Sequence, residues 1–508
     1  MRNRRNNIVF GPIVGPIIGM TLLLAAPAFA REEYSRSFDK TVTLANGQSV
    51  RVEHRMGNVN LRTHAGRDVV VHASIRVSAS NDADAKRLSD QIRIEVAPAG
   101  SALVIRTEYP KEEHDGFFGF HGLSYLSYSV NLNVSMPETA PLELHNSFGS
   151  VTVEDLKANG DITNANGKLT FRNGRGTQRL EDQFAAVEVT GNKGDVEIRN
   201  SNGSVDVSDV TGIVNVKNRF ANVTISNPGR GGTIVNGNGA VQVTGAGGDV
   251  RITNSFGKVT VSGVKGNLVV GNGNGEVEAN SVTGSAELNT SFGTVRFGDI
   301  GKVLSVRATN SAVIGRKVGE SATIENSFGR VDISDVHKGI RIVGGNSPIT
   351  VADVGEEASL KTSFGLVTAD RVGGVLTVES SNAAVKASGI RNSANVKTSF
   401  GAVLLDGVAG SVDVDNQNGG VEVSLQGQAC RPVGIRTSFS AVRVRVPDNA
   451  SYAVAAKTSF GKIHSDFPMT ISGDISSDSL NGNIGGGGCP MRLNDNNGSI
   501  EILKNGKG

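Results

Sequence analysis

The stretch NSFGKVTV at residues 254–261 decides the fold, because near copies of it recur along the chain at a fixed interval. Its central phenylalanine belongs to a series with a 36-residue step: Phe148, Phe184, Phe220, Phe256, Phe292, Phe328, Phe364 and Phe400. Asparagine takes the same place halfway between them: Asn166, Asn202, Asn238, Asn274, Asn310, Asn346, Asn382 and Asn418. The chain therefore has an 18-residue period, and a fixed short period is the signature of a repeat architecture.

Each 18-residue unit holds two short runs in which apolar residues alternate with polar ones. Val187 and Val189 form the first apolar pair of one unit, and Val196 and Ile198 form the second. Alternation at period two predicts strands, and the Gly, Asn and Asp residues between the pairs predict turns. One unit cannot bury its own apolar residues, but stacked units can. The sequence therefore predicts an all-β fold, a parallel β-solenoid (β-helix) of about 20 coils, each about 4.8 Å above the last.

Two further columns accompany the period. Asparagine stands two residues before most of the Phe and Asn positions, as at Asn254 and Asn272, and stacked amides can form hydrogen bonds from coil to coil. For the phenylalanines we expect a core position, where each ring fills a corner two coils deep. The alternative is an outward aromatic stripe that binds glycans. Such stripes favour Trp and Tyr, and this chain has no Trp.

Composition supports a thin core and an uncharged overall balance. The 508 residues include 65 Gly, and only 5% are aromatic. Residues 1–30 contain three of the 51 basic residues and none of the 49 acidic ones. Without this segment the formal charge is −1. Such a balance gives no support for nucleic-acid binding, which requires a basic face.

Residues 1–30 have the pattern of a signal peptide. Arg2, Arg4 and Arg5 precede a long apolar stretch, and small residues stand at Ala28 and Ala30. We expect cleavage between Ala30 and Arg31 and an exported chain, in the periplasm, the cell envelope or outside the cell. The alternative is an uncleaved anchor. No later apolar run is long enough to span a membrane, so we expect no transmembrane segment in the mature chain.

Residues 31–140 lack the 18-residue period and indicate a β-rich N-terminal cap domain, with one short helix at 81–91 that begins at Asn81 or Asp82. Such a cap would cover the open strand edges of the first coil. We expect regular coils over 141–436 and irregular coils over 437–508. Within the cap, Phe117, Phe118, Phe120 and His121 lie in one loop, which is either a contact tip or a segment that folds back over the cap.

The two cysteines, Cys430 and Cys489, are the candidates for one disulfide, which export would permit. These residues fall in coils three apart, about 14 Å by the coil rise. That separation exceeds the reach of a disulfide unless the loops bend toward each other.

No catalytic or metal-binding motif stands out. Glu188 and Asp206 occupy the same outward position in successive coils, near the separation of the carboxylates in a retaining glycosidase. No basic or aromatic cluster supports them, so a solvated pair is the better interpretation. His54, His64 and His72 could share a strand face, but a metal site there has little support. We expect no catalytic residues, no metal and no cofactor.

Two stretches carry a resemblance to a known family. GDVEIRNSNGSVDVSDVTG at 194–212 and the closing LNGNIGGGGCPMRLNDNNGSIEI at 480–502 resemble the bacterial putative-adhesin family, a cell-envelope domain of unknown function. The resemblance implies a β-solenoid at the cell envelope. It supplies no catalytic residues.

The sequence thus favours a secreted, non-enzymatic β-solenoid, an adhesin or envelope scaffold that presents a long repetitive surface. A polysaccharide-processing β-helix enzyme and a self-assembling filament are the alternatives. The partner is unknown, with envelope polysaccharide, a surface protein and end-to-end self-association as the candidates.

Overall fold

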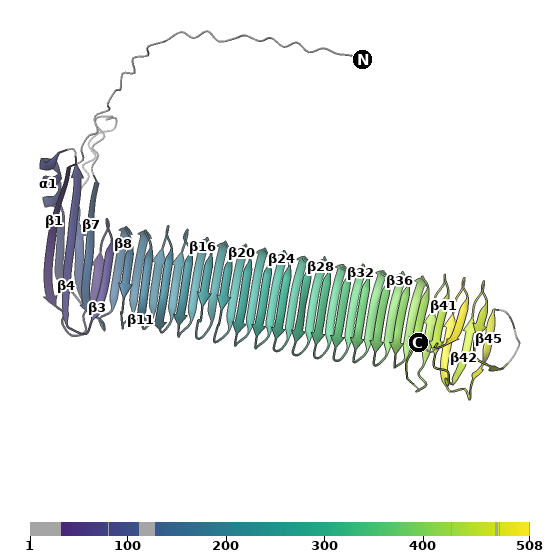
Figure 1. Ribbon diagram of the computed structural model, residues 1–508. Coiled ribbons are helices and arrows are strands. Elements are labelled where there is room, and N and C mark those ends of the chain that lie inside the picture. Colours follow the sequence, from purple (N-terminus) through teal and green to yellow (C-terminus); the bar gives the residue numbers. More distant parts are fainter. Residues whose placement is uncertain are drawn as a thin grey trace, which may run out of the picture.

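The computed structural model describes residues 32–79, 81–110, 127–427, 429–472, 476 and 478–506. Strands make up 66% of it and helix 2%, and the strands form a parallel β-solenoid of about 17 turns with a spacing of about 18 residues. The predicted fold class is therefore confirmed. Figure 1 shows the result as a long rod that begins at a broader N-terminal end.

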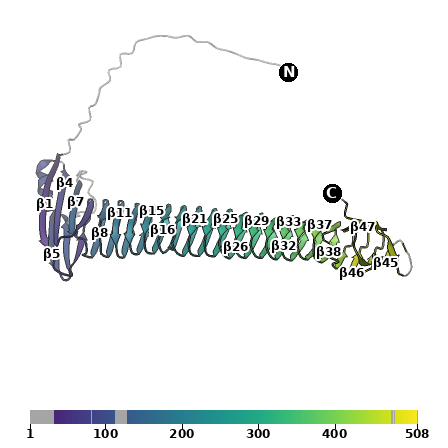
Figure 2. The same ribbon diagram turned by 60° about the horizontal axis from the view of Figure 1, so that its bottom comes forward.

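Each regular coil contributes one strand to each of two parallel sheets, seen from a second side in Figure 2. The strands of the first sheet are β8 (Leu142–Phe148), β10 (Gly160–Asn166), β12 (Gln178–Asp182), β14 (Val196–Asn200), β16 (Val214–Phe220), β18 (Gly232–Asn238), β20 (Val250–Phe256), β22 (Leu268–Asn274), β24 (Ala286–Phe292), β26 (Leu304–Asn310), β28 (Ala322–Phe328), β30 (Ile340–Asn346), β32 (Ala358–Phe364), β34 (Leu376–Asn382), β36 (Ala394–Phe400) and β38 (Val412–Asn418). The strands of the second sheet are β9 (Val151–Glu154), β11 (Leu169–Arg175), β13 (Val187–Lys193), β15 (Val205–Val210), β17 (Val223–Ser226), β19 (Val241–Thr244), β21 (Val259–Val264), β23 (Val277–Val282), β25 (Val295–Ile300), β27 (Val313–Val318), β29 (Val331–Val336), β31 (Ile349–Val354), β33 (Val367–Val372), β35 (Val385–Ile390), β37 (Val403–Val408) and β39 (Val421–Leu425).

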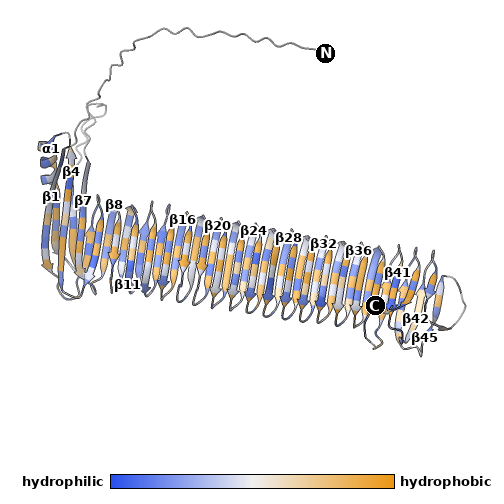
Figure 3. Cartoon of the chain, in the orientation of Figure 1, coloured by the Kyte–Doolittle hydropathy of each residue, from blue (hydrophilic) through white to orange (hydrophobic). Residues whose placement is uncertain are grey.

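The core is a set of apolar columns, because neighbouring strands pair at an 18-residue offset. Val250 of β20 pairs with Leu268 of β22, and Ile252 pairs with Val270. None of these four residues is more than 2% exposed. The polar residues between them point outward, so hydrophobic and hydrophilic residues alternate along the strands in Figure 3. Burial of these columns is the main favourable contribution to the stability of the fold.

The turn between the two sheets explains the glycine that follows most of the repeat phenylalanines. Gly257 has φ +114°, and a Cβ atom there would lie 2.4 Å from the carbonyl oxygen of Gly239 in the preceding coil. Glycine adopts this conformation without strain and allows the close approach of the two backbones. The turn at the other edge uses Asp209 (φ +57°), Asp335 (φ +59°) and their equivalents, a region that Asp tolerates better than most residues.

The N-terminal strands continue the solenoid and then close it. They are β1 (Glu32–Thr43), β2 (Ser49–Glu53), β3 (Val59–His64), β4 (Asp68–Ala79), β5 (Arg93–Ala99), β6 (Ala102–Glu108) and β7 (Ser127–Pro137), with helix α1 (Asp82–Gln91). Strands β2 and β3 pair in parallel with β8 and β9, whereas β1, β4 and β5 add antiparallel strands beyond them. The side chain of Asn81 accepts a hydrogen bond from the backbone N–H of Asp84 and so caps α1 as predicted. The domain boundaries given above stay predictions.

The C-terminal coils do not follow one another in sequence order. Their strands are β40 (Val433–Arg436), β41 (Val442–Val446), β42 (Tyr452–Lys457), β43 (Ile463–Ser465), β44 (Met469–Ile471), β45 (Ser479–Ile484), β46 (Cys489–Asn494) and β47 (Ile500–Lys504). Strand β46 lies between β40 and β42, and β47 lies between β41 and β43. The coil of β46 and β47, the last in the sequence, therefore lies between the coil of β40 and β41 and the coil of β42 and β43, and β47 lies beside β41 instead of at the tip. Strands β44 and β45 are antiparallel and close the end.

This insertion explains the geometry of the two cysteines. The expected separation of three coils assumed sequence order and is wrong, because β46 lies directly beside β40. The structure pairs Cys430 and Cys489 as a disulfide, with their Cα atoms 5.7 Å apart. A disulfide forms and persists in an oxidising compartment, so this bond depends on the export of the chain that is proposed below.

Candidate functional site

The phenylalanines of the repeat lie on the surface, so the expectation that they fill the core is wrong. The exposed fractions of the phenylalanines in this row range from 44% for Phe220 to 80% for Phe460. In β20 the last inward residue is Asn254, and both residues after it point outward because the chain has begun to turn. The corner of the core is therefore closed by an amide, and no room remains for a ring. A polar residue two positions before each ring was the signal in the sequence that could have shown this.

Phenylalanine and asparagine alternate along this corner from coil to coil. Phe256 is paired in register with Asn238 on one side and with Asn274 on the other. Consecutive rings are thus two coils apart, about 9.6 Å at the usual strand spacing. Each asparagine leaves a gap between two rings.

The alternation continues through the C-terminal coils because of their inserted order. Phe439 bridges to Asn418 on one side and to Asn497 on the other. The coil of Phe460 follows that of Asn497, since β43 pairs with β47 and the N–H of Phe460 donates to the carbonyl of Asn496. We call the whole row the phenylalanine–asparagine edge: the eight repeat phenylalanines, the eight repeat asparagines, and then Phe439, Asn497 and Phe460.

The inner asparagine column fixes the turn on which the edge stands. The side-chain amide of Asn272 donates to the carbonyl of Gly275 in its own coil (3.1 Å) and to that of Gly257 in the preceding coil (3.0 Å). The expected bonds between amides occur as well, from Asn254 to Asn272 (3.3 Å). Later coils use the hydroxyl of Thr398 to bond the carbonyl of Ala383 in the same way (3.3 Å). These bonds satisfy turn carbonyls that would otherwise be buried without a donor.

One carboxylate interrupts this column. Asp182 is 1% exposed and accepts hydrogen bonds from the backbone N–H groups of Phe184 and Ala185. Burial nevertheless raises the pKa of Asp182 to about 6, because the N–H donors offset only part of the desolvation of the charge.

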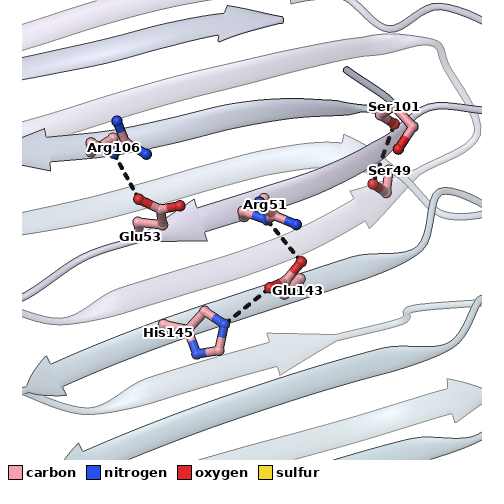
Figure 4. Close-up of polar contacts among 7 residues, drawn as sticks. All are labelled: Ser49, Arg51, Glu53, Ser101, Arg106, Glu143 and His145. Atoms are coloured by element: carbon pink, nitrogen blue, oxygen red, sulfur yellow. Dashed lines mark hydrogen bonds and ion pairs between the residues drawn. The ribbon is translucent and has the colours of Figure 1, made fainter. Parts of the chain in front are cut away.

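The sheet faces carry ladders of paired charges. Figure 4 shows one at the N-terminal end, where Arg106 bonds Glu53 (2.7 Å) and Glu143 lies between Arg51 (2.8 Å) and His145 (3.2 Å). Arg106 lowers the pKa of Glu53 through this hydrogen bond. The groups are partly exposed to water, so each pair contributes little to stability.

The candidate catalytic carboxylates are held by other partners. Glu188 and Asp206 do lie in register on neighbouring strands, but Glu188 also forms ion pairs with Lys168 and Arg172. Its hydrogen bond with Lys168 lowers the pKa of Glu188, and a general acid needs the opposite shift.

The three histidines do not converge either. His54 is buried and lies 3.0 Å from the hydroxyl of Thr107, His64 binds its own turn, and His72 pairs with Asp39. Burial lowers the pKa of His54 to about 4. Within the described ranges, no group of three or more His, Cys, Asp or Glu residues could hold a metal ion.

A hollow of about 670 Å³ lies on the first sheet beside the middle of the edge. Its lining includes the polar side chains of Asn289, Thr309 and Ser327 from successive coils. Its charged members, Arg307 and Glu325, pair with each other (3.6 Å). The hollow therefore adds polar contacts beside the edge and shows no carboxylate free for catalysis among the residues described there.

Two predicted sites lie outside the described residues: the cleavage position at Ala30 and Arg31, and the contact loop with Phe117, Phe118, Phe120 and His121. Among the residues that the structure does describe, no helix is long and apolar enough to cross a membrane.

Comparison with known proteins supports the resemblance found in the sequence. Residues 317–503 match the family model described as Toastrack DUF4097, a domain family of unknown function. The expected resemblance is thus confirmed over residues 317–503. No curated protein matches the chain.

Two solved structures are similar to parts of the rod. A putative cell adhesion protein from Clostridium sporogenes is 11% identical, and the match covers 44% of this chain and 100% of that one, with a TM-score of 0.22. A putative adhesin from Parabacteroides distasonis is 10% identical, and the match covers 62% and 97%, with a TM-score of 0.18. At these scores neither similarity bears on function.

Proposed function

We propose that this protein is an exported, non-enzymatic β-solenoid that acts as an adhesin or scaffold in the cell envelope, and that it binds through the phenylalanine–asparagine edge. The observation that carries the proposal is the exposure of ten phenylalanines in a single row. A half-exposed Phe leaves roughly 100 Å² of ring in water. The row therefore gathers much more exposed aromatic surface along one line than the single, scattered apolar residues of an ordinary surface, and apolar surface gathered in this way marks interaction sites.

Export is supported by the sequence of residues 1–30, with their basic start, apolar stretch and small residues at Ala28 and Ala30. The close approach of Cys430 and Cys489 agrees with an oxidising compartment. The family match agrees with a domain that has no assigned chemistry.

The two alternatives have less support. A polysaccharide-processing enzyme would need a carboxylic acid with a raised pKa beside a second carboxylate. On the sheet faces, Glu188 instead pairs with basic groups that lower its pKa. Filament growth end to end would need open coils at both ends, whereas antiparallel strands follow the last coils described at each end.

A pull-down tests the proposal. The full chain is immobilised and exposed to envelope material from cells that lack it, and the same is done with the triple variant Phe256→Ser, Phe292→Ser and Phe328→Ser. The matched control replaces three apolar surface residues outside the edge, Val235, Val303 and Leu404, which are 38–40% exposed. We expect envelope material on the native chain and on the control, and little on the edge variant. Equal retention by all three, or none by the native chain, would refute binding through the edge.

A further inference from the structure

The phenylalanine–asparagine edge has a shape that a second copy of the same edge can fill. Rings of one chain are separated by about 9.6 Å. A ring placed midway between two of them has centroid distances of about 4.8 Å, within the favourable range of roughly 4.5–7 Å for aromatic pairs. The gap is located at each asparagine, as at Asn274 between Phe256 and Phe292. A partner must therefore present apolar groups at the same repeat, and this chain does so.

We infer that two copies of this chain associate side by side and antiparallel, with the phenylalanines of each edge inserted at the asparagines of the other. This inference rests on the proposed function, since it uses the same exposed edge, and it adds a second copy of the chain to the envelope material that the edge binds. A twofold axis perpendicular to the rods, midway between two neighbouring coils, places every Phe coil opposite an Asn coil. A parallel pair about an axis along the rods would instead place Phe opposite Phe. The antiparallel arrangement is isologous and closed, as in most homodimers.

Two positions of the axis give the largest overlap. The edge has nineteen coils and begins and ends with Phe, so an axis between the coils of Phe292 and Asn310 pairs eighteen of them. Phe148 then lies opposite Asn497 of the partner subunit. An equally long overlap exists when the axis moves by one coil toward Phe328, and charge decides between the two.

Charged residues are scarce on the edge. Each of its nineteen coils contributes four residues, from one before the Phe or Asn to two after it, and six of these 76 are charged, against 20% of the whole chain. They are Lys168, Arg219, Lys258, Glu276, Arg330 and Lys462. A facing edge therefore meets few charges, and the positions of those few can select its register.

The charges favour the axis between Phe292 and Asn310. In this register Glu276 lies opposite Arg330 of the partner subunit, and the pair occurs twice by symmetry. The other three basic residues within the overlap, Lys168, Arg219 and Lys258, lie opposite the partner's Ala441, the partner's Ser381 and the partner's Pro348.

The alternative register loses this attraction and adds a repulsion. With the axis one coil further on, Glu276 would lie opposite Leu366 of the partner subunit, and Arg330 would lie opposite the partner's Ala312. Lys168 would lie opposite the partner's Lys462, which brings two positive charges together. The first register therefore avoids like charges in opposition and is the one that we expect.

The contact area is sufficient for a stable dimer. Nine rings from each chain, each with roughly 100 Å² exposed, offer roughly 900 Å² per chain. Stable protein interfaces bury about 800 Å² per partner. Depletion of charge around an aromatic centre is also the composition that interface cores show.

The first test measures association of the full chain by sedimentation velocity over a dilution series. We expect a dimer that the triple variant Phe256→Ser, Phe292→Ser and Phe328→Ser weakens at least about 100-fold, since six rings are lost per dimer. The control with serine at Val235, Val303 and Leu404 should dimerise like the native chain. Thermal melts establish that all variants are folded. A monomeric native chain, or equal dimerisation of the two triple variants, would overturn the inference.

The second test fixes direction and register by disulfide trapping. Ser204 and Ala402 lie opposite each other across the proposed axis, two residues after Asn202 and Phe400. A mixture of Ser204→Cys and Ala402→Cys chains should form mixed crosslinks, whereas each variant alone should not. Crosslinks within the separate variants would show a parallel pair and contradict the inference, as would the absence of mixed crosslinks.

Charge reversal gives a readout that does not depend on the rings. Glu276→Arg should weaken the dimer, and adding Arg330→Glu should restore it; failure of the double variant to recover would count against this register. A monomeric native chain that still retains envelope polysaccharide through its phenylalanines would refute self-association and leave the proposed function intact. A dimer that retains no envelope material would refute the proposed function and leave self-association intact.

Discussion

Replacing Asp182 with Asn should stabilise the protein at neutral pH. Asp182 occupies a place that Asn164 and Asn200 fill in the adjacent coils. An amide oxygen can still accept the two backbone N–H bonds that the carboxylate receives from Phe184 and Ala185. Its NH₂ group can also donate to turn carbonyls, as Asn164 does to the carbonyl of Gly149 (3.1 Å). The substitution therefore removes a buried charge and keeps the two backbone hydrogen bonds, while the amide of Asn164 loses the second carboxylate oxygen that accepts from it (3.3 Å).

The magnitude follows from the pKa of Asp182, about 6 in the fold against an ordinary 3.8. A raised carboxyl pKa means that the folded state binds the proton more tightly than the unfolded state does. The free energy of unfolding therefore falls as pH rises from about 4 to 6, and the penalty is complete above pH 6. A pKa difference of this size corresponds to about 3 kcal/mol. The advantage of Asp182→Asn over the native chain should thus grow by up to about 3 kcal/mol between about pH 3.5 and pH 7.

Urea unfolding of both chains across this pH range measures the difference directly. His54 also titrates here, with a pKa of about 4, and its burial destabilises the fold as pH falls from 6.5 toward 4. Because both chains contain His54, its effect cancels in the difference. Asp206→Asn, which removes an exposed carboxylate from β15 in the second sheet, is the matched control variant. A difference between Asp182→Asn and the native chain that stays flat with pH would refute the reasoning.

Three further outcomes follow from the placement of the repeat residues. Phe256→Ala should lower the free energy of unfolding by less than about 1.5 kcal/mol because half of the ring is exposed, whereas Phe171→Ala, which removes a fully buried ring, should lower it by about 3–5 kcal/mol. Chemical denaturation of the two variants measures both values. Equal losses would contradict an outward position for Phe256. Asn272→Ala should cost about 1–3 kcal/mol, since the carbonyls of Gly257 and Gly275 lose their donor, while Asn274→Ala on the exposed edge should change the free energy of unfolding by less than about 0.5 kcal/mol. Deleting residues 255–272 should give a rod with the same melting temperature as deleting 255–290, because both deletions keep the inward columns in register. Deleting 255–263, half a coil, should lower the melting temperature strongly. A much lower melting temperature for the 18-residue deletion than for the 36-residue one would mean that the Phe–Asn alternation has a packing role.

The regular coils could be predicted from the sequence because their period fixes both the strands and their pairing. An 18-residue repeat with apolar pairs such as Val187 and Val189 determines the strands, their register and the inward columns. The structure confirms these three predictions for the regular coils. The side on which Phe256 lies was mispredicted because hydrophobicity alone was used. The burial of Asn254 two residues earlier decides the direction, and a polar inward residue is the exception to the usual pattern.

The order of the C-terminal coils was not predicted, because the fixed 18-residue period that orders the regular coils ends after Asn418. Phe439 and Asn497 are far apart in sequence but adjacent in space. The insertion of β46 beside β40 depends on contacts between distant segments, and it also brings Cys430 and Cys489 together. The alternation of Phe and Asn was the available signal, because it is restored only if the coil of Asn497 lies between those of Phe439 and Phe460.

Hydroxyl-radical footprinting of the chain, free at high dilution and mixed with envelope material from cells that lack it, tests most directly whether the edge is the binding surface. In the free chain, the rings of Phe256, Phe292 and Phe328 should be oxidised readily, and the buried rings of Phe171 and Phe297 should be protected. In the mixture, oxidation of the three edge rings should fall while that of Val235 and Leu404 stays unchanged. Unchanged oxidation of the edge, with new protection elsewhere on the rod, would contradict the account.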